Sequence, residues 1–225
     1  MSNTTPEPAA PPSDRTRVRR YHWLARYDRE TINDIIDAGI VCHVGYVFDG
    51  HPYVTPTNHW RIDDHVYWHG SSASRMLRAQ SQGIPVCFSV THLDGIVLAR
   101  SAFNHNINFR SVMAFGKAEL VPADEIESVL EVFTNRIAPG LWDHARKPEP
   151  KEWKATKVIR LRLDEVSAKV RTGPPIDDEA DYQLDHWAGV IPLHTVLGPV
   201  EPDPKLRPGT PTPDFIQNFK LWKDR

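Results

Sequence analysis

Short stretches of alternating apolar and polar residues recur along the chain, and a period of two is typical of half-buried β-strands. Turn signals separate neighbouring stretches: Asp49-Gly50 is a strong hairpin signal, and Asp63-Asp64 and Asp94-Gly95 lie between later runs. We therefore expect most of the chain to fold as strands joined in sequence. The predicted strands are residues 40–48, 52–60, 65–69, 85–92, 96–103, 112–121, 158–163 and 166–171.

Helical patterns are fewer. Residues 29–38 place isoleucines on one face, with Asp28 as the predicted N-cap and Gly39 at the C-terminal end. A second helix is predicted at residues 71–82, with Ser71 or Ser72 as its N-cap. Further helices are expected at residues 124–137 and 150–154.

The strands come in runs and do not alternate with helices, which favours antiparallel pairing over a parallel α/β sheet. The fold class that we predict is mainly β, an antiparallel sheet closed into a barrel with a few helices packed outside it. Residues 104–110 are expected to form a polar loop. Gly116, inside a predicted strand, indicates a bulge or a close approach of two strands.

Three segments differ in composition. Residues 1–14 are polar and rich in proline without an apolar stretch, so we expect a disordered tail and no signal peptide. Residues 15–172 contain the predicted strands and form the main domain. From residue 173 to 225 prolines are frequent and periodicity is weak, which predicts an extended arm packed on the barrel or on a partner subunit.

Charge, hydrophobicity and cysteine content limit the classes of function and the cellular location that we expect. The formal net charge is −2 with both signs interspersed, so there is no basic stripe for nucleic acid. No apolar run approaches the ~18 to 20 residues that span a bilayer. The two cysteines, Cys42 and Cys87, lie in apolar segments outside any CxxC pattern, which favours reduced core thiols and a cytoplasmic protein, while a disulfide between them stays open.

The chemistry of the chain centres on the corner where the strand at residues 65–69 reaches Gly70-Ser71-Ser72 and a helix begins. Free N–H groups at a helix start, with Ser74 and the cation of Arg75 beside them, favour an anion such as phosphate. The alternative is an ordinary capped helix with a solvated arginine, because neither the Walker pattern nor GxGxxG is present.

Several segments together resemble a known family. They are VCHVGYVFDGHPYVTPTNHW, VYWHGSSASRMLRA, VLARSAFNHNINFRSVMAFGKAELV, SAKVRTGPPIDDEADY and HWAGVIPL, spread over about residues 20–200. In this order they resemble the FMN-binding split-barrel proteins related to pyridoxamine 5′-phosphate oxidase, and within that group the nitroimidazole-resistance-like flavoproteins most of all.

The resemblance implies an antiparallel split β-barrel that forms a homodimer, with an FMN cofactor in each of two clefts between the subunits. It implies that the strand of Val54, Thr55, Pro56 and Thr57 runs beside the isoalloxazine ring. The phosphate would be held by His69, Gly70, Ser71, Ser74 and Arg75. Other residues implied near the flavin, some from the neighbouring subunit, are Arg110, Ser111, Lys169, Arg171 and Trp187.

Two departures from the oxidase matter. Its phosphate corner carries Ser-Arg-Lys, whereas Ser74-Arg75 is followed here by Met76. The missing cation should weaken the hold on the phosphate by roughly 1 to 3 kcal/mol unless another donor replaces it. The C-terminal arm also lacks the Arg-x-His-type substrate signature, which argues against turnover of pyridoxamine phosphate.

The resemblance, together with the predicted phosphate corner, implies an FMN-dependent oxidoreductase that acts on a small, aromatic or nitro-aromatic compound with electrons from NAD(P)H. A flavin brings its own redox chemistry, so no catalytic triad is needed. The alternative is a non-catalytic flavin- or haem-binding carrier or sensor, and a deazaflavin in place of FMN stays open. The eleven histidines show no HExxH or other ligand-spaced cluster, so no metal site is predicted. The absence of GxSxG leaves no serine hydrolase motif.

Overall fold

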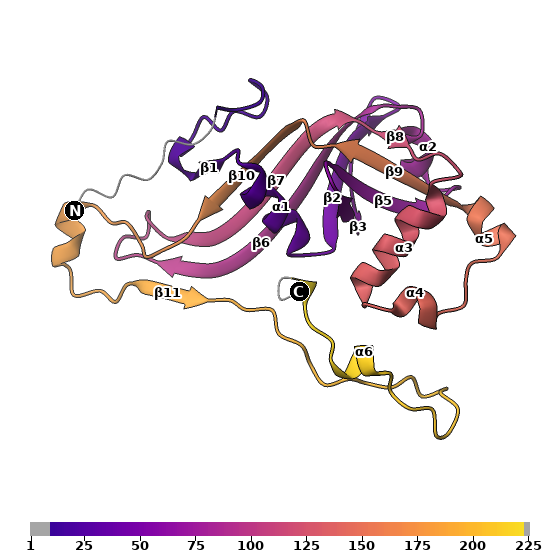
Figure 1. Ribbon diagram of the computed structural model, residues 1–225. Coiled ribbons are helices and arrows are strands. Elements are labelled where there is room, and N and C mark those ends of the chain that lie inside the picture. Colours follow the sequence, from indigo (N-terminus) through magenta and orange to yellow (C-terminus); the bar gives the residue numbers. More distant parts are fainter. Residues whose placement is uncertain (1–9, 223–225) are drawn as a thin grey trace.

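The strands of the computed structural model form two antiparallel sheets, which pack face to face with helices around them (Figure 1). The structure describes residues 10–222, so most of the predicted N-terminal tail lies outside the described residues. The seven-stranded sheet has the order β1-β10-β7-β6-β2-β3, with β11 also paired to β6. The four-stranded sheet has the order β4-β5-β9-β8. The strands are β1 (Ala25–Arg26), β2 (Val41–Phe48), β3 (His51–Asn58), β4 (Trp60–Ile62), β5 (His65–Ser71), β6 (Pro85–Leu98), β7 (Asn106–Lys117), β8 (Glu119–Leu120), β9 (Thr156–Arg162), β10 (Glu165–Arg171) and β11 (Gly189–Pro192).

Short helices join and cover the sheets. They are η1 (His22–Leu24), α1 (Arg29–Asp37), α2 (Arg75–Gln80), α3 (Ile126–Ile137), α4 (Leu141–His144), α5 (Pro150–Ala155), η2 (Glu179–Gln183) and α6 (Asp214–Gln217). The predicted helix at residues 29–38 is confirmed as α1, where the Asp28 side chain accepts a hydrogen bond from the Thr31 N–H. None of the helices in residues 10–222 has the length and apolar character needed to cross a membrane.

The main core lies between the two sheets. One face of β2, β6, β7 and β10 meets one face of β5 and β9 there, and α1 contributes its three isoleucines, all at most 2% exposed. The largest buried side chains include Trp68 and Phe88, whose rings stack at 6.2 Å. The prediction of a mainly antiparallel β protein is therefore confirmed. The sheet does not close into one continuous barrel, because the chain passes from one sheet to the other after β3.

This passage corrects the prediction of a single strand over residues 52–60. β3 ends at Asn58, and Trp60 already belongs to β4 in the other sheet. Between them His59 is fully buried, and its Nε2 lies 2.9 Å from the Ile36 carbonyl oxygen of α1. The alternating pattern continues through the junction because both neighbouring strands bury one face, so periodicity alone could not locate it.

Two further strand predictions were wrong. Asp94-Gly95 does not close a hairpin: β6 runs straight through it, with a register irregularity between Leu93 and Gly95. The extra residue of a bulge explains why a turn signal can sit inside a long strand. The predicted loop at residues 104–110 is mostly strand, since β7 begins at Asn106 and pairs with the second half of β6.

The single strand predicted at residues 112–121 is divided, because residues 112–117 belong to β7 and β8 lies in the four-stranded sheet. The remaining predicted elements hold with small shifts. Asp49 and Gly50 both have positive φ, at 51° and 74°, as a tight hairpin between β2 and β3 requires. Gly116 is confirmed as a close approach, because a Cβ there would lie 2.7 Å from Leu161 Cδ1 on β9. Gly39 follows α1 as predicted, but its φ is not left-handed. It is needed because a Cβ would lie 2.8 Å from the ring of His92.

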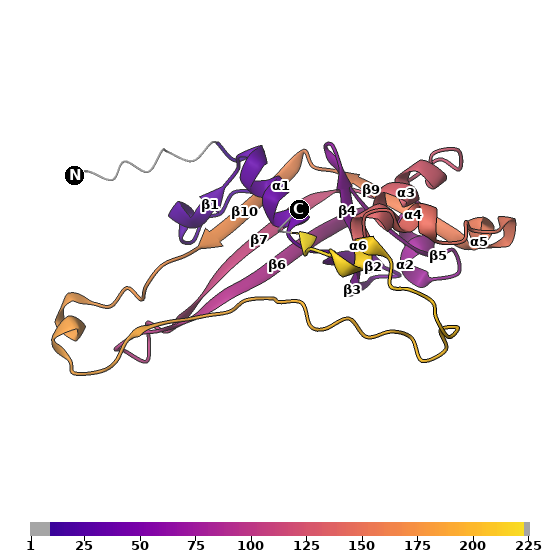
Figure 2. The same cartoon turned by 60° about the horizontal axis from the view of Figure 1, so that its bottom comes forward.

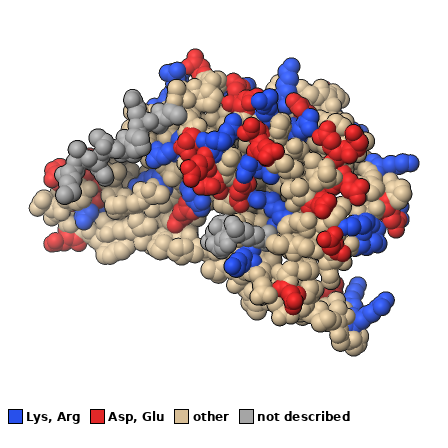
Figure 3. Space-filling model, in the orientation of Figure 1, with Lys and Arg blue, Asp and Glu red and all other residues tan. Residues whose placement is uncertain are grey.

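The predicted C-terminal arm leaves the body and returns to it (Figure 2). β11 pairs with β6, and near the C-terminus the Trp222 indole N–H donates to the Arg136 carbonyl oxygen at 3.0 Å. Residues 193–211 of the arm, which precede α6, are exposed, with Val196 at 78% and Val200 at 56%. Figure 3 shows charges of both signs interspersed over the face in view, in keeping with the small net charge.

Candidate functional site

The corner predicted to bind an anion lies at the end of β5, where the chain turns into α2. The N-cap of α2 is Ser74, whose hydroxyl oxygen accepts from the Leu77 N–H at 3.2 Å. This corrects the expectation that Ser71 or Ser72 would cap the helix. Ser71 instead closes the preceding turn, where its hydroxyl oxygen accepts from the Ala73 N–H at 3.2 Å and its carbonyl oxygen accepts from the Ser74 N–H.

These contacts leave several donors free at the corner. A hydroxyl that accepts one hydrogen bond still has its own O–H to donate, so Ser71 and Ser74 can each present a hydrogen to an anion. The N–H groups of Arg75 and Met76, the first two of α2, have no acceptor among the described residues. Arg75 is exposed. Met76 is buried, with only 7% of its surface exposed, so it offers the corner only its backbone.

The corner meets the strand that the sequence predicts beside the flavin ring. β3 is the last strand of its sheet and pairs only with β2, so its other backbone edge has no strand partner within residues 10–222. The Arg75 guanidinium lies 4.7 Å from the centre of the Tyr53 ring on β3. Val54, the next residue, is 69% exposed, while Thr55, Pro56 and Thr57 continue the same edge. The fold thus brings residues 54–57 and the corner together.

His69 and Gly70 contribute differently because neighbouring residues of a strand face opposite sides. Gly70 faces α2, and a Cβ there would lie 3.0 Å from Leu77 Cδ2. The His69 ring packs on the other side against Trp60 and Phe133, with ring centres 5.8 and 4.8 Å away. Burial lowers the pKa of His69, so its ring is neutral at pH 7. Only the backbone of His69 faces the corner.

Arg110 and Ser111 are also neighbours on one strand, so their side chains point to opposite faces of the sheet. Ser111 lies opposite Lys169 and Thr91, on the outer face of the seven-stranded sheet. Arg110 faces the other side, where its Nε and Nη2 each donate to Asp94 at 2.8 Å. These hydrogen bonds raise the pKa of Arg110. The two residues therefore serve different surfaces of one subunit.

The remaining predicted residues lie away from the corner of their own chain. Lys169 projects from the outer face, with its ammonium 5.5 Å from the centre of the Tyr21 ring. Arg171 is only 8% exposed and donates to the side chain of Asn108 and to the Pro174 carbonyl oxygen. Trp187 is 69% exposed on the arm. Within one subunit Arg171 holds the start of the arm.

One cation near the corner was missed from the sequence. Lys157 on β9 lies directly opposite Gly70, and its Nζ donates to the Ser81 hydroxyl at the end of α2, 3.2 Å away. Its place depends on the pairing of β5 with β9, which are separated by more than eighty residues. The alternating pattern of residues 158–163 predicts a strand, but it does not predict which strand lies beside it.

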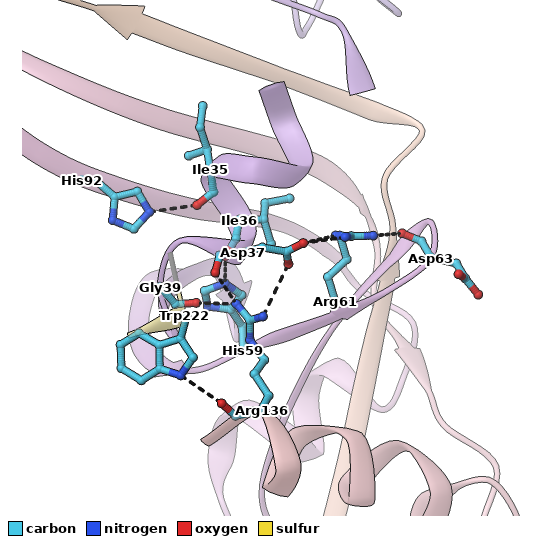
Figure 4. Close-up of polar contacts among 10 residues, drawn as sticks. All are labelled: Ile35, Ile36, Asp37, Gly39, His59, Arg61, Asp63, His92, Arg136 and Trp222. Atoms are coloured by element: carbon cyan, nitrogen blue, oxygen red, sulfur yellow. Dashed lines mark hydrogen bonds and ion pairs between the residues drawn. The ribbon is translucent and has the colours of Figure 1, made fainter. Parts of the chain in front are cut away.

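Two of the eleven histidines, His59 and His92, contact the end of α1. The last carbonyl groups of α1 have no partners within the helix. Nε2 of His92 lies 2.8 Å from the Ile35 carbonyl oxygen, and His59 serves Ile36 in the same way (Figure 4). Arg136 donates to the carbonyl oxygens of Asp37 and Gly39 at 2.8 and 2.9 Å. Within residues 10–222, no three His, Cys, Asp or Glu side chains gather as a metal site would need.

A cavity of about 650 Å³ lies elsewhere, between the end of α1, the middle of β6 and β7, and the C-terminal arm. It shares no residue with the α2 corner. Its polar lining includes the Arg110–Asp94 pair and His92, and the arm adds His194 and Trp222. Nothing in the sequence pointed to this cavity, because the arm that forms one wall has little periodicity.

Comparisons with known proteins give matches that cover most of the chain. Residues 28–170 match the family described as pyridoxamine 5′-phosphate oxidase. The flavocytochrome Anf3 from Azotobacter vinelandii is 50% identical, with 94% of this chain and 99% of that chain covered and a TM-score of 0.90. The FAD and haem binding protein from Mycobacterium smegmatis is 36% identical, with 86% and 96% covered and a TM-score of 0.83.

A more distant structure supports the fold alone. It is a proposed 5-nitroimidazole antibiotic resistance protein from Bacteroides thetaiotaomicron, 22% identical, with 65% of this chain and 86% of that chain covered and a TM-score of 0.50. No curated protein matches the chain.

Proposed function

The chain belongs to the pyridoxamine 5′-phosphate oxidase family, as its sequence predicted, and from this premise we propose that it is a flavin-dependent redox protein. The observation that carries the proposal is the junction of the α2 corner with the free edge of β3, where Arg75 lies over Tyr53. Free hydroxyl, N–H and guanidinium donors at one end suit a phosphate. An unpaired strand edge beside them suits the polar rim of a flavin ring.

Each group has a defined task in this proposal. The hydroxyls of Ser71 and Ser74, with the first N–H groups of α2, donate hydrogen bonds to the phosphate, and Arg75 adds a positive charge. Residues 54–57 of β3 donate and accept backbone hydrogen bonds along the ring. A bound flavin supplies hydride and single-electron chemistry, which explains why the protein needs no catalytic triad.

The cofactor we expect is FMN or its extended form FAD, since both carry the same ring and first phosphate. FMN follows from the sequence resemblance, while the M. smegmatis relative is described as FAD binding. The α2 corner would bind the first phosphate of either cofactor. Absorbance of the purified protein followed by mass spectrometry of the extracted ligand distinguishes FMN, FAD and a deazaflavin. A colourless protein that gains no flavin spectrum when incubated with FMN or FAD would contradict the proposal.

We further propose that the protein oxidises or reduces a small aromatic or nitro-aromatic compound with electrons from NAD(P)H. Anaerobic mixing with NADH or NADPH should bleach the flavin absorbance rapidly. A flavin that stays oxidised with both donors would favour the alternative of a non-catalytic carrier or sensor. Turnover of pyridoxamine phosphate is not expected, because the C-terminal arm lacks the Arg-x-His-type substrate signature.

The partner we propose is a second copy of the chain, held by the outer face of the seven-stranded sheet. Directly paired residues of β2, β3, β6 and β7 share this face, and the central ones carry no formal charge. Exposed apolar faces of this kind mark interfaces. The outer face consists of His43, Val47, Val54, Pro56, Cys87, Ser89, Ser111, Met113 and Phe115.

Haem is the second cofactor that we propose. The relatives at 50% and 36% identity are described as a flavocytochrome and as an FAD and haem binding protein, and each is covered over almost its whole length. The observation in this chain that favours haem is a cavity of sufficient size with imidazole groups in its lining. Haemin titration followed by absorbance in the Soret region tests this second cofactor independently of the flavin.

A further inference from the structure

The cavity under the C-terminal arm has the form of a cofactor site. Its volume of about 650 Å³ falls within the range of ~300 to 1,000 Å³ that is usual for small-molecule and cofactor pockets. Apolar walls come from Leu93 on β6, from Leu193 on the arm and from Leu221 near the C-terminus. Because β2 pairs with β6 only up to Ser89 and β11 only from Gly95, the cavity opens at a gap along one edge of β6.

One cation in the wall has a free donor. Arg110 binds both carboxylate oxygens of Asp94 through Nε and Nη2, so its remaining Nη1 has no acceptor among the described residues. The ion pair cancels the charge of Asp94 and fixes the guanidinium plane. A negatively charged group at the mouth of the cavity would therefore meet a preorganised N–H donor and no uncompensated carboxylate from this pair.

Two imidazoles line the cavity, and they differ in availability. Nε2 of His92 lies 2.8 Å from the Ile35 carbonyl oxygen, and its ring occupies the space that a Cβ at position 39 would need, so this side chain is held against the end of α1 (Figure 4). His194 comes from the arm, is exposed, and makes no hydrogen bond or ion pair with any residue in 10–222. Neutral imidazole is a common metal ligand, and it needs a free ring nitrogen.

We infer that this cavity is the haem site, that His194 is the iron ligand, and that Arg110 pairs with a haem propionate. The inference rests on the proposed haem binding and adds its location and its ligand. The apolar side chains of the walls and the Trp222 ring, oriented by its hydrogen bond to Arg136, would cover the faces of the porphyrin. The flavin corner shares none of these residues, so the two cofactors occupy separate sites.

The test is a haemin titration of the purified full-length protein, read by the position and intensity of the Soret band. Wild type should bind one haemin per chain. His194→Ala should weaken binding by about tenfold or more and shift the Soret band, since an iron ligand is lost. Added imidazole should restore the wild-type band position in this variant. His186→Ala, an exposed histidine on the same arm outside the cavity, is the matched control and should behave as wild type.

Three results would overturn the inference, and they have different meanings. Wild type that takes up no haemin removes haem from the proposed function as well. Haem binding with an unchanged spectrum in His194→Ala refutes the ligand and leaves the proposed function intact. Loss of the haem spectrum in His92→Gln but not in His194→Ala would place the ligand on β6. Flavin content measured in the same samples keeps the flavin proposal separate.

Discussion

His59 illustrates how a single side chain joins two parts of this protein. It occupies the junction of β3 and β4, is fully buried, and serves the end of α1 through Nε2. Nδ1 is buried without a partner in the described chain, so the ring is kept neutral. Burial lowers the pKa of His59 from its ordinary value of 6.5 to about 4, and outweighs the hydrogen bond to Ile36, which acts in the opposite direction.

This lowered pKa predicts acid sensitivity. Between pH 6.5 and about 4 the unfolded chain binds a proton at His59 that the folded chain does not, so the free energy of unfolding falls as the pH is lowered through this window. The loss amounts to roughly 3 kcal/mol. In His59→Gln the amide can still donate to Ile36, and urea unfolding at several pH values should show a shallower pH dependence than in wild type. An equally steep dependence in this variant would refute the account. His51→Gln, at an exposed strand end, is the control.

Signals carried by one or two residues predicted the local structure most reliably. Asp28 caps its helix and Asp49-Gly50 forms its hairpin as predicted, because both depend on local backbone geometry alone. Ser74 replaced the predicted N-cap because a turn closed by Ser71 comes first. The opposite directions of Arg110 and Ser111 also follow from strand alternation, but only once the loop predicted at residues 104–110 is known to be strand.

At the scale of elements, the approach of β7 to β9 depends on Gly116. A Cβ there would lie 2.7 Å from Leu161 Cδ1, and Leu161 is 1% exposed in the main core. We expect Gly116→Ala to lower the free energy of unfolding by about 1 to 3 kcal/mol, as overpacking does. Urea denaturation measures this. Gly198→Ala is the control, because nothing lies within 4 Å of its added Cβ. Equal stability of both variants would contradict the predicted close packing.

Element types were predictable, but sheet membership was not. The periodicity of residues 158–163 and 166–171 predicts two strands, yet β9 and β10 belong to different sheets because β9 pairs with β5 and β10 with β7. Such pairings join residues far apart in sequence, and they depend on which faces can be buried together. For the same reason, the sequence alone did not predict the position of Lys157 near the corner or the cavity under the arm.

At the scale of the whole molecule, the outer face predicts dimerisation, because its central residues carry no formal charge. Met113 lies in the middle of this face and is 44% exposed. A buried glutamate without a partner is costly, so Met113→Glu should shift the protein toward monomer in analytical ultracentrifugation. Its flavin content should fall too, if the cofactor lies between subunits. Val132→Glu places the same charge at a residue 42% exposed on α3 and should remain dimeric. A dimeric Met113→Glu protein would exclude this face as the interface.

The central claim is that the α2 corner holds the phosphate of a flavin, and flavin affinity tests it most directly. Apo-protein titrated with FMN and FAD, followed by quenching of flavin fluorescence, compares Arg75→Ala with Arg78→Ala, since both arginines are exposed on the same short helix. The account predicts that Arg75→Ala raises the Kd by about tenfold to a hundredfold, the loss of one charge-assisted contact, while Arg78→Ala stays within about twofold of wild type. Equal affinities for wild type and Arg75→Ala would contradict the claim.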